Sequence, residues 1–468
     1  MPSLLIVALL LLNGVATAKT VQTDLVRIEH QVVTRGLEHP WSLAFLPDGR
    51  FLVTERPGRL RIVEADGRLL PEPVGGLPII EASGQGGLLD VVLHPDFEQN
   101  RWVYFSYNEP GPGGMGTAVG RGRLQAGQLH DTQVLFRLTP KSGRGLHFGS
   151  RLVFDRQGHL FITLGDRGER PRAQDLADHA GSIIRLNDDG SIPAGNPFVG
   201  HPTARPEIYS YGHRNSQGAT LHPVDGRLWT HEHGPQGGDE INLPEAGVNH
   251  GWPVITYGVN YGIGTRIGEG TEKPGMAQPL HYWVPSIAPS GMAFYQGDKF
   301  PAWHNDLFVG SLKFRLLVRL RIRDGGVVQE ERMLANKLGR IRDVRVGPDG
   351  FIYLLTDADD KRVICCHGPP SQLVRKTPEK PKRPCRPDPC AVSARVSEKG
   401  TRRKQPGTHP NGASRQSPGR STAVRRCGWE GRCLGQWRVG RWSRGELRLS
   451  LERIRRTATR LLPWQPPL

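Results

Sequence analysis

Six times along this chain, an apolar run leads into a short polar turn and then into a second apolar run. The first three copies are LAFLPDGRFLVTE from Leu43, VVLHPDFEQNRWVYFSY from Val91 and LVFDRQGHLFITLGD from Leu152. The other three are ATLHPVDGRLWTHE from Ala219, MAFYQGDKFPAWHNDLFVG from Met292 and VRVGPDGFIYLLTD from Val344. Turns of Pro, Asp and Gly between β-branched and aromatic runs are typical of β-hairpins. The pattern therefore predicts six hairpins.

The spacing of these hairpins predicts the architecture. Their turns lie near positions 47, 95, 156, 223, 296 and 348, so neighbouring units are 48 to 73 residues apart. A single hairpin cannot bury both of its faces, and a strand-only repeat of this period predicts the blades of a propeller. We therefore expect an all-β, six-bladed β-propeller over residues 25–360. The surplus length of the middle units falls in loops, where binding and catalytic residues are commonly carried.

Composition changes sharply near residue 360. The whole chain of 468 residues has a formal charge of +17, yet its first 360 residues hold 36 Lys and Arg against 39 Asp and Glu. Residues 361–468 hold 26 Lys and Arg against 6 Asp and Glu. The same segment contains all six cysteines: Cys365, Cys366, Cys385, Cys390, Cys427 and Cys433. The basic character thus belongs to a separate segment.

This segment, residues 361–468, lacks the alternation of strands and is rich in Arg and Pro. Such a composition predicts a disordered tail, because too little apolar area is available for burial. An artefact of an altered reading frame is a second interpretation. A basic Arg/Trp segment could also bind an anionic surface or nucleic acid, but we do not expect nucleic-acid binding.

The N-terminus predicts export. An apolar run from Leu4 to Leu12 precedes Ala16-Thr17-Ala18, which has the form of a signal-peptide cleavage site. Residues 1–18 are therefore expected to be a signal peptide, and the protein to be periplasmic or secreted. The alternative is an apolar N-terminal strand. The run is too short to span a bilayer, and no other stretch resembles a membrane span.

Two loop regions carry candidate chemistry. His147 comes just before the first strand of one unit and Asp166 just after its second, so both are expected at one rim; the alternative is a structural histidine. Further along, EHGPQGGDEIN combines a Gly/Pro-rich loop with two carboxylates. Backbone and carboxylate oxygens are the ligands that Ca²⁺ prefers.

Three late basic residues, Lys313, Arg340 and Arg342, are expected at the starts of blades. Residues at these places line the central funnel of a propeller. Surface Lys and Arg are usually just solvated, but a cationic funnel suits a polyanionic ligand.

The sequence resembles a known family in eight motifs that occur in the same order. The motifs are GQGGLLDVVLHPDF, HFGSRLVF, LGDRG, YGHRNSQG, EHGPQGGDEIN, GWPVITYGVNY, SGMAFY and RIRDVRVGPDG. They are similar to those of the soluble aldose sugar dehydrogenases of the glucose/sorbosone dehydrogenase family, which use pyrroloquinoline quinone (PQQ). The resemblance covers about residues 25–360 and does not extend to the tail.

The resemblance implies oxidation of aldose sugars at C1 to the lactone, with PQQ on the propeller axis and Ca²⁺ holding it. His147 would be the general base, while hydride moves to the quinone, and Asp166 would orient it or its surroundings. Arg214 would lie on the quinone oxygens and stabilise developing negative charge. The remaining cofactor contacts implied are Gln85, Asn215, Tyr261, Lys313, Arg340 and Arg342.

For the metal, the resemblance implies that the backbone carbonyls of Gly234 and Pro235 bind the calcium of the cofactor. A second calcium site of the family uses a glutamate, here Glu240, and a tyrosine position that His250 occupies in this chain. Imidazole is a poor ligand for a hard cation, so this departure leaves the second site open.

The expected partners are an aldose substrate and an external electron acceptor, for a monomer or homodimer. Two other function classes stay open at this point. One is a calcium-dependent propeller lactonase or hydrolase, and the other is a non-catalytic propeller that binds a ligand. Neither needs several separate cationic groups at one funnel, which is the feature that favours the oxidoreductase.

Overall fold

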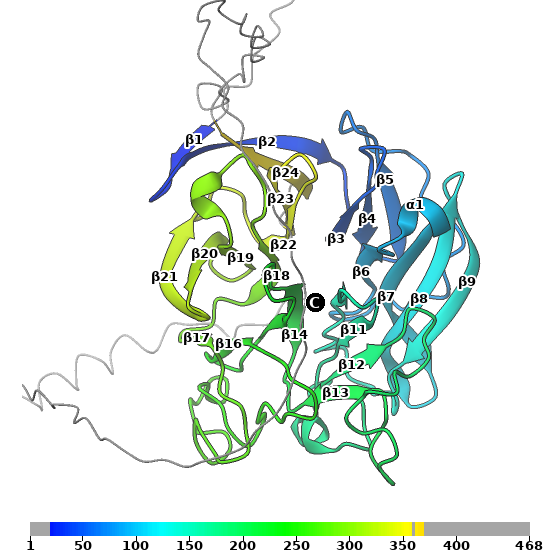
Figure 1. Cartoon of the computed structure of the whole chain (residues 1–468), viewed down its shortest axis with the longest axis vertical. Helices are drawn as coiled ribbons and strands as arrows, with labels where there is room; N and C mark the ends of the chain where they lie inside the picture. Colours follow the sequence, from blue (N-terminus) through cyan, green and yellow to red (C-terminus); the bar gives the residue numbers. More distant parts are fainter. Residues whose placement is uncertain (1–18, 358–360, 369–468) are drawn as a thin grey trace, which may run out of the picture. The chain divides into compact units, whose positions relative to one another are not determined.

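The computed structural model describes residues 19–357 and 361–368. Within these residues, six antiparallel sheets follow one another, and each predicted hairpin forms the first two strands of one sheet (Figure 1). The all-β, six-bladed propeller expected from the repeat is therefore confirmed. We number the sheets as blades 1 to 6 in the order of these hairpins.

Blades 1 to 3 come from the first half of the chain. Blade 1 has three strands: β3 (Pro40–Phe45), β4 (Phe51–Glu55) and β5 (Arg59–Val63). Blade 2 has four strands and a one-turn helix: β6 (Leu88–Leu93), α1 (Phe97–Asn100), β7 (Trp102–Gly111), β8 (Gly114–Gln125) and β9 (Gln128–Arg137). Blade 3 consists of β10 (Leu152–Phe154), β11 (Leu160–Thr163), β12 (Ser182–Leu186) and β13 (Ile208–Tyr211), with the 3₁₀ helix η1 (Arg170–Gln174) in a connection.

Blades 4 to 6 follow the same order. Blade 4 consists of β14 (Ser216–Leu221), β15 (Leu228–Glu232), β16 (Asp239–Asn242) and β17 (His281–Trp283). Blade 5 consists of β18 (Pro289–Phe294), β19 (Leu307–Ser311), β20 (Leu316–Arg323) and β21 (Gly326–Met333), with η2 (Pro301–Trp303) after β18. Blade 6 has five strands, in the order β22 (Ile341–Val346), β23 (Ile352–Thr356), β24 (Arg362–His367), β2 (Arg27–Arg35) and β1 (Lys19–Gln22).

The first strands of the blades form a closed inner ring. Each of β3, β6, β10, β14, β18 and β22 contacts the next in this order, and β22 contacts β3. The residues at the start of these six strands therefore converge on one axis, although they are far apart in sequence.

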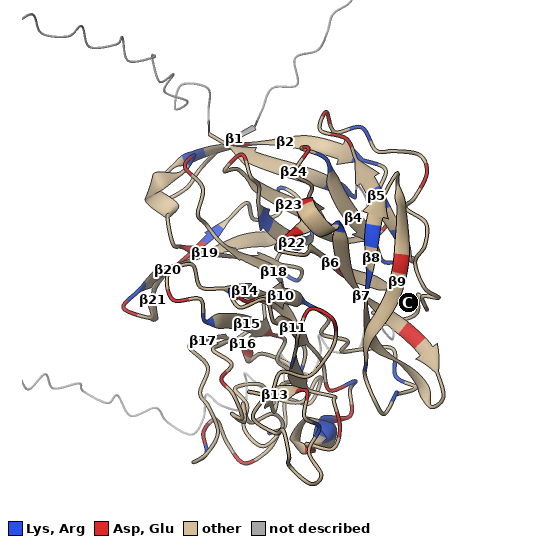
Figure 2. Ribbon diagram, turned by 45° about the vertical axis from the view of Figure 1, so that its right-hand side comes forward, with Lys and Arg blue, Asp and Glu red and all other residues tan. Residues whose placement is uncertain are grey.

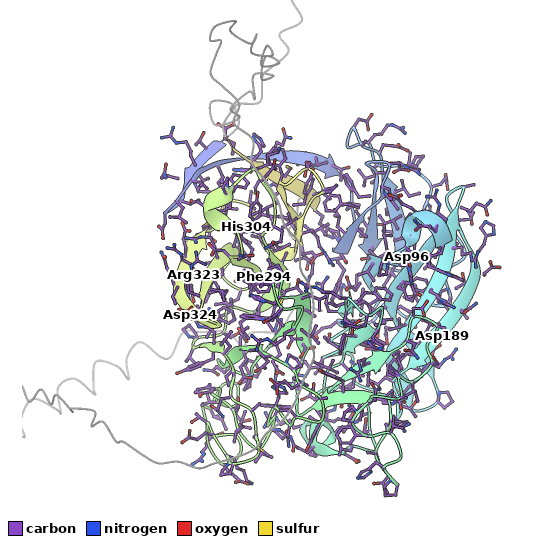
Figure 3. All side chains as sticks on the ribbon, in the orientation of Figure 1. Asp96, Asp189, Phe294, His304, Arg323 and Asp324 are labelled. Carbon is purple, nitrogen blue, oxygen red and sulfur yellow. The ribbon has the colours of Figure 1, made fainter. Side chains whose placement is uncertain are left out.

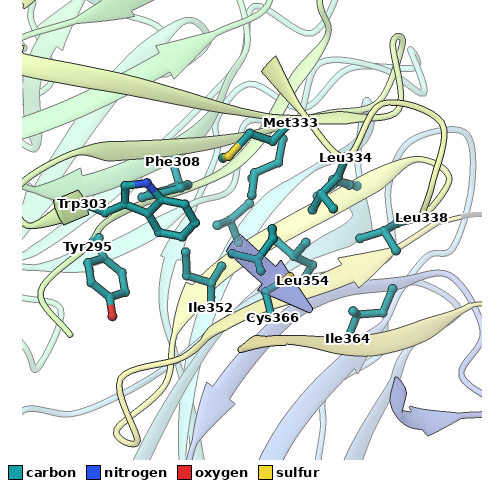
Figure 4. Packing of buried hydrophobic residues seen from close by; sticks show 14 of the residues in the cluster. Tyr295, Trp303, Phe308, Met333, Leu334, Leu338, Ile352, Leu354, Ile364 and Cys366 are labelled. Carbon is teal, nitrogen blue, oxygen red and sulfur yellow. The ribbon is translucent and has the colours of Figure 1, made fainter. Parts of the chain in front are cut away.

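Each junction between neighbouring blades is filled by one buried apolar cluster. Figure 4 shows the junction of blades 5 and 6, where Phe308 and Met333 pack against Ile352, Leu354 and Ile364. Because both faces of a sheet are covered, inner strands such as β4 and β15 are buried at every position. Side chains fill the spaces between the ribbons (Figure 3).

The sixth blade corrects the expected boundary at residue 360. The strand β24 lies between β23 and β2, and its residues Cys365 and Cys366 are buried. The propeller therefore extends to His367, and it contains these two cysteines. The change in composition hid this strand, because its apolar run RVICC directly precedes the Pro- and Arg-rich segment.

The N-terminal segment closes the ring. β2 pairs antiparallel with β24, with Arg35 opposite Arg362 and Glu29 opposite His367 (Figure 1). The first and last strands of the propeller thus share one sheet. The predicted signal peptide, residues 369–468 and the other four cysteines lie outside the described residues.

Acidic and basic residues are interspersed over the blades (Figure 2), in keeping with the near balance of charge before residue 361. In the part of the chain that the structure describes, no helix is long and apolar enough to cross a membrane.

Candidate active site on the propeller axis

A cavity of about 500 Å³ lies where the six blades converge. Its walls come from all six blades, mostly from the starts of first strands and the ends of second strands. The lining residues are Trp41, Arg56, Gln85, His147, Arg214, Asn215, Gln217, His233, Tyr261, Ala288, Leu312, Lys313, Arg340, Arg342 and Asp357.

The structure brings the sequence-predicted residues together at this cavity. His147 lines it, and so do all seven residues expected to contact a cofactor: Gln85, Arg214, Asn215, Tyr261, Lys313, Arg340 and Arg342. Asp166 is buried behind His147. These positions span more than 250 residues of sequence, and only the closed ring of inner strands makes them neighbours. Their individual roles remain predictions.

His147 is held in one orientation by Asp166. Its Nδ1 lies 2.6 Å from Oδ1 of Asp166, whose carboxylate is fully buried and also accepts a hydrogen bond from the backbone N–H of Gly168. The imidazole pKa is lowered by burial, with Arg214 and Arg167 adding to the effect and Asp166 opposing it. The pKa of Asp166 is itself lowered, because hydrogen bonding and charge from His147 outweigh burial.

An ionised Asp166 can only accept, so Nδ1 of His147 carries the proton and Nε2 has the free lone pair. At neutral pH the imidazole is therefore uncharged and basic at Nε2. The backbone of His147 has φ = 54°, a left-handed conformation that is unfavourable for a residue with a Cβ. Such strain is typical of residues whose position matters for function.

Arg167 clamps the loop that carries His147. Its guanidinium donates to the carbonyl oxygens of Arg144, at 2.6 Å, and Leu146, and it lies 3.5 Å from the ring centroid of Phe148. Burial lowers the pKa of Arg167 to about 10. Asp166 and Arg167 are neighbours, so one short segment fixes both the imidazole and the backbone on either side of it.

Gln85 and Asn215 support the same loop. Oε1 of Gln85 accepts a hydrogen bond from the backbone N–H of His147 at 2.9 Å. Oδ1 of Asn215 accepts one from Gly149 at 3.1 Å. Each of these amides therefore has its oxygen engaged with the protein, which leaves the NH₂ groups as donors toward the cavity.

The cavity is strongly cationic. Arg56, Arg214, Lys313, Arg340 and Arg342 line it, and Asp357 is the one carboxylate among its lining residues. Asp357 is shared, since its Oδ2 lies 3.7 Å from Arg342 and its Oδ1 lies 2.9 Å from Nδ1 of His39. Among the described residues, no ion pair holds Lys313 or Arg340.

Crowding of these cations affects Arg342. Burial, together with repulsion from Arg340, Arg56 and Arg151, lowers its pKa to about 10. Among the described residues, its guanidinium donates one hydrogen bond, to Oε1 of Gln217 at 3.2 Å. Arg342 stays charged at neutral pH, and an anion in the cavity would relieve the repulsion.

Arg214 faces the cavity from a buried position beside the base. Its guanidinium donates to the carbonyl oxygen of His233 at 2.9 Å and lies 5.3 Å from the ring centroid of Trp252. Its backbone N–H donates to Glu232. Both its backbone and its side chain are thus fixed independently of any ligand.

The predicted metal-binding loop lies next to the cavity. Gly234, Glu240 and His250 line a small hollow together with Arg214 and His233, which also line the main cavity. Gly234 and Pro235 are buried, and their carbonyl oxygens accept no hydrogen bond from the described residues. Buried carbonyl groups without partners are uncommon, so this pair of oxygens is suited to a cation.

The second predicted metal position is less complete. Burial and the neighbouring Glu232 raise the pKa of Glu240 well above its ordinary value. His250 stacks on His213 with ring centroids 4.4 Å apart, and neither of its ring nitrogens has a hydrogen-bond partner in the described structure. In this part of the chain, no group of three or more His, Cys, Asp or Glu residues is arranged to hold a metal. A second calcium site therefore stays a prediction. Of the two expected residues, Glu240 and His250, only Glu240 has a side chain that suits calcium.

Sequence reasoning missed several cavity residues. Second strands are directly followed by cavity residues in four cases: Arg56, His233, Leu312 and Asp357, so the repeat itself could have indicated them. Lys313, which the sequence predicted at the start of a blade, instead follows Leu312 after the second strand of blade 5. Trp41 and Gln217 lie at the starts of first strands, like Arg342. Ala288 directly precedes the first strand of blade 5.

Comparisons with known proteins agree with this site. The sequence profile of the family described as Glucose / Sorbosone dehydrogenase matches residues 37–365. Aldose sugar dehydrogenase YliI of Escherichia coli is 49% identical over 340 residues, which are 71% of this chain and 91% of that protein. The chain therefore belongs to the glucose/sorbosone dehydrogenase family and is an oxidoreductase, as the sequence motifs predicted.

Solved structures show the same relationship. The soluble aldose sugar dehydrogenase from Escherichia coli, in its apo-form, is 47% identical with a TM-score of 0.71, over 73% of this chain and 100% of that one. The PQQ-bound form of aldose sugar dehydrogenase from Streptomyces coelicolor is 29% identical with a TM-score of 0.61, over 73% of this chain and 98% of that one.

Proposed function

We propose that this protein oxidises the C1 hydroxyl of aldose sugars to the lactone, with PQQ as the acceptor of the hydride and Ca²⁺ beside it. One observation carries the proposal. A neutral imidazole, oriented by a buried carboxylate, opens into a cavity whose five cationic side chains face a single carboxylate. A similar protein from Streptomyces coelicolor has been solved in a PQQ-bound form, which supports this choice of cofactor.

The donor set fits PQQ, a planar quinone with three carboxylates. Lys313, Arg340 and Arg342 would bind its anionic groups. The first two have no ion pair among the residues that the structure describes, and Arg342 is crowded by cations. The amides of Gln85 and Asn215 and the ring of Tyr261 line the same space. When bound, PQQ would supply the two-electron oxidation that no amino-acid side chain provides.

The residues of the chain would perform the proton transfer. His147 would take the proton of the C1 hydroxyl at Nε2, and the ionised Asp166 would stabilise the resulting imidazolium through Nδ1. Arg214 would stabilise negative charge that develops near it, because its guanidinium is already held by His233 and needs no rearrangement. A neutral base and a fixed cation in one cavity suit the oxidation of an alcohol.

Calcium would be held by the free carbonyl oxygens of Gly234 and Pro235. They lie in a buried loop next to Arg214, and hard oxygen ligands are the ones Ca²⁺ prefers. We also propose that the protein acts outside the cytoplasm, because residues 1–18 resemble a signal peptide. The electrons would then pass from the cofactor to an external acceptor.

Reconstitution tests the proposal. The protein as isolated should be inactive, and it should reduce an artificial dye with glucose or another aldose after PQQ and Ca²⁺ are added together. Addition of PQQ should also produce a bound chromophore in calcium buffer. If PQQ yields neither dye reduction nor a bound chromophore, the cavity serves another anionic ligand and the proposal is wrong.

A further inference from the structure

Trp252 contacts two charged groups of the site, the carboxylate of Asp166 and the guanidinium of Arg214. It is 5% exposed and does not line the main cavity. Its indole Nε1–H donates to Oδ2 of Asp166 at 2.8 Å, and its ring centroid lies 5.3 Å from Cζ of Arg214. The carboxylate behind the base and the fixed cation beside it therefore meet on one side chain.

Trp252 is itself held in place by its backbone and its packing. Its backbone N–H donates to the carbonyl oxygen of Gly212 at 2.9 Å, and its carbonyl oxygen accepts from Nε2 of Gln174 at 2.7 Å. The ring packs with Ala173 and Ile267 in a small buried cluster. Trp252 can therefore define the positions of its neighbours rather than follow them.

The contact with Asp166 is chemically selective. Oδ1 of this carboxylate accepts from Nδ1 of His147 and from Gly168, whereas Oδ2 accepts from Trp252 and from no other described residue. Without Nε1–H, one oxygen of a fully buried carboxylate would have no donor. That state is costly and leaves the carboxylate free to turn.

The contact with Arg214 is of a different kind. The guanidinium lies near the aromatic ring, and within the described part of the chain it donates one hydrogen bond, to the carbonyl oxygen of His233. A cation near an aromatic ring is attracted by the electrons of the ring, more strongly where water is excluded. Trp252 thus holds Asp166 through its N–H and Arg214 through its ring, and substitutions can separate the two effects.

We propose that Trp252 is a positioning residue that fixes the Asp166–His147 pair through Nε1 and the guanidinium of Arg214 through its ring. This inference rests on the proposed function for the importance of His147, but not for the contacts themselves. The charged groups that face His147 are Asp166, Arg214 and Arg167, and those that face Asp166 are His147, Arg214 and Arg167. A second cation also faces the ring of Trp252, because Cζ of Arg170 lies 5.5 Å from its centroid.

The sign of the electrostatic effect follows from the hydrogen bond. An N–H donor to the carboxylate withdraws some of its negative charge, so Asp166 stabilises a protonated His147 less than a free carboxylate would. Removal of the donor should therefore raise the pKa of His147. The base would then be protonated over a wider range of acidic pH.

Two substitutions test the inference in the full chain. Trp252→Phe removes Nε1–H and keeps an aromatic ring, so the titration midpoint of the His147 imidazole should move upward in the cofactor-free protein. The measurement is NMR of ¹⁵N-labelled histidine rings, with the signal assigned through His147→Gln. PQQ affinity, measured by titration of the protein's fluorescence, should change by no more than about 2–3-fold, because the ring contact with Arg214 remains.

Trp252→Leu removes the ring as well. The same upward shift of the imidazole titration should appear, and PQQ affinity should now fall by about 5–10-fold, as expected for loss of a buried cation–π contact. After reconstitution, kcat/KM at pH 6 should fall by about 3–10-fold more than at pH 8 in both variants, because a larger share of the base is protonated.

Trp283→Phe is the matched control. Trp283 is also buried, at 3% exposed, and its Nε1 donates to a carboxylate, Glu330, at 2.9 Å. It should lower thermal stability to a similar extent while the His147 titration and PQQ affinity stay as in the wild type. If Trp252→Phe behaves like this control, Trp252 is merely structural and the inference is wrong.

A measurement on the unsubstituted protein covers the case in which the variants do not fold. The indole N–H signal of Trp252 should shift as His147 titrates, since Asp166 links the two groups. An indole signal that is insensitive to this titration would overturn the inference. If the indole signal shifts while reconstituted protein shows no aldose oxidation, the contact is real and the proposed function is what fails.

Discussion

Two clusters of arginine lie against each other on the propeller axis, and they differ in their partners. In the cavity, the cations face one shared carboxylate. A second cluster adjoins the cavity and consists of Asp90, Arg151, Asp343 and Arg345; we call it the ionic floor. Arg151 lies 2.9 Å from Asp90 and 3.2 Å from Asp343, and Arg345 lies 2.9 Å and 2.8 Å from the same two carboxylates. The floor is thus balanced, with two cations and two anions.

The strand β22 contributes an arginine to each cluster, and their pKa values move in opposite directions. Burial and the cations around Arg342 lower its pKa to about 10. For Arg345, burial is outweighed by Asp343 and Asp90, and the pKa rises above its ordinary value. Two residues of the strand lie between Arg342, whose one ion-pair partner among the described residues is Asp357 at 3.7 Å, and Arg345, which has two carboxylates at 2.9 Å and 2.8 Å. We infer that the floor joins the blades and that the cavity is built to receive an anion.

The two clusters are in direct contact. Cζ of Arg151 lies 4.4 Å from the ring centroid of Trp41, and its Nε donates to the backbone oxygen of Gln217 at 3.2 Å. Trp41 and Gln217 line the cavity. A change in the floor should therefore appear first in stability, and a change in the cavity in binding and turnover. Five predictions sharpen this distinction.

The largest effect is expected when blade 6 is cut, because β22 serves both clusters. A chain that ends at Asp360 lacks β24, so β23 and β2 lose the strand that joins them. It should be insoluble or unfolded, as judged by circular dichroism and gel filtration. A chain that ends at Gly368 should fold and bind PQQ. A folded, PQQ-binding protein that ends at Asp360 would show that β24 is dispensable.

On the cavity side, His147→Gln should reduce kcat by about 10²–10⁴-fold, the usual cost of losing a general base. PQQ affinity and thermal stability should change little, since the imidazole is not among the cationic groups. Steady-state kinetics and PQQ titration measure the two effects. Turnover close to that of the wild type would show that another group accepts the proton.

The repeat predicts the six blades, and it also contains a signal for the ionic floor that was not recognised from the sequence. The hairpins were identified because each carries a polar turn between two apolar runs. The floor was not, yet Asp90, Arg151 and Asp343 occupy one equivalent position, directly before the apolar residues Val91, Leu152 and Val344 of their first strands. Ser42 has the same position in blade 1, and its Oγ donates to Asp90 at 2.5 Å.

The preceding position explains part of the cavity. Trp41, Gln217 and Arg342 stand one residue before the floor position, and all three line the cavity. Successive residues of a strand point in opposite directions, so adjacent positions can serve different clusters. By contrast, Trp252 and the clamp by Arg167 depend on long loops whose paths follow no repeat, and sequence alone could not place them.

On the floor side, Asp90→Asn should destabilise the protein by about 3–5 kcal/mol, as expected when one partner of a buried ion pair is removed. Arg151 and Arg345 would each lose a carboxylate partner. Chemical denaturation measures the loss. Asp48→Asn is the control, because the Asp48–Arg50 pair is exposed and should contribute less than about 1 kcal/mol. Equal effects of the two substitutions would contradict the role of the floor.

Lys313→Ala should have a smaller effect, and this effect should be on PQQ affinity rather than on stability. This residue has no ion pair among the described residues, so its removal should leave the stability of the cofactor-free protein unchanged or slightly raised. PQQ affinity should fall by about 10–100-fold, the cost of one charge-assisted contact. Lys273→Ala, which removes an exposed lysine paired with Glu269, should alter neither quantity. A drop in stability without a change in affinity would place Lys313 with the structural residues.

The smallest effect concerns the influence of nearby cations on the pKa of His147. Burial lowers the pKa of His147, and Arg214 and Arg167 add to that effect. The base is neutral above its pKa, so kcat/KM should fall as the pH decreases through a midpoint below the ordinary value of 6.5, and it should be constant near neutrality. In cofactor-free protein, Arg214→Gln should raise the midpoint of the imidazole titration measured by NMR, because a repelling charge is removed. Arg50→Gln should leave it unchanged, because Arg50 is paired with Asp48 and does not line the cavity. A midpoint that does not respond to Arg214→Gln would mean that the unpaired cations of the cavity do not act on the base, and that the contrast with the floor concerns ligand binding alone.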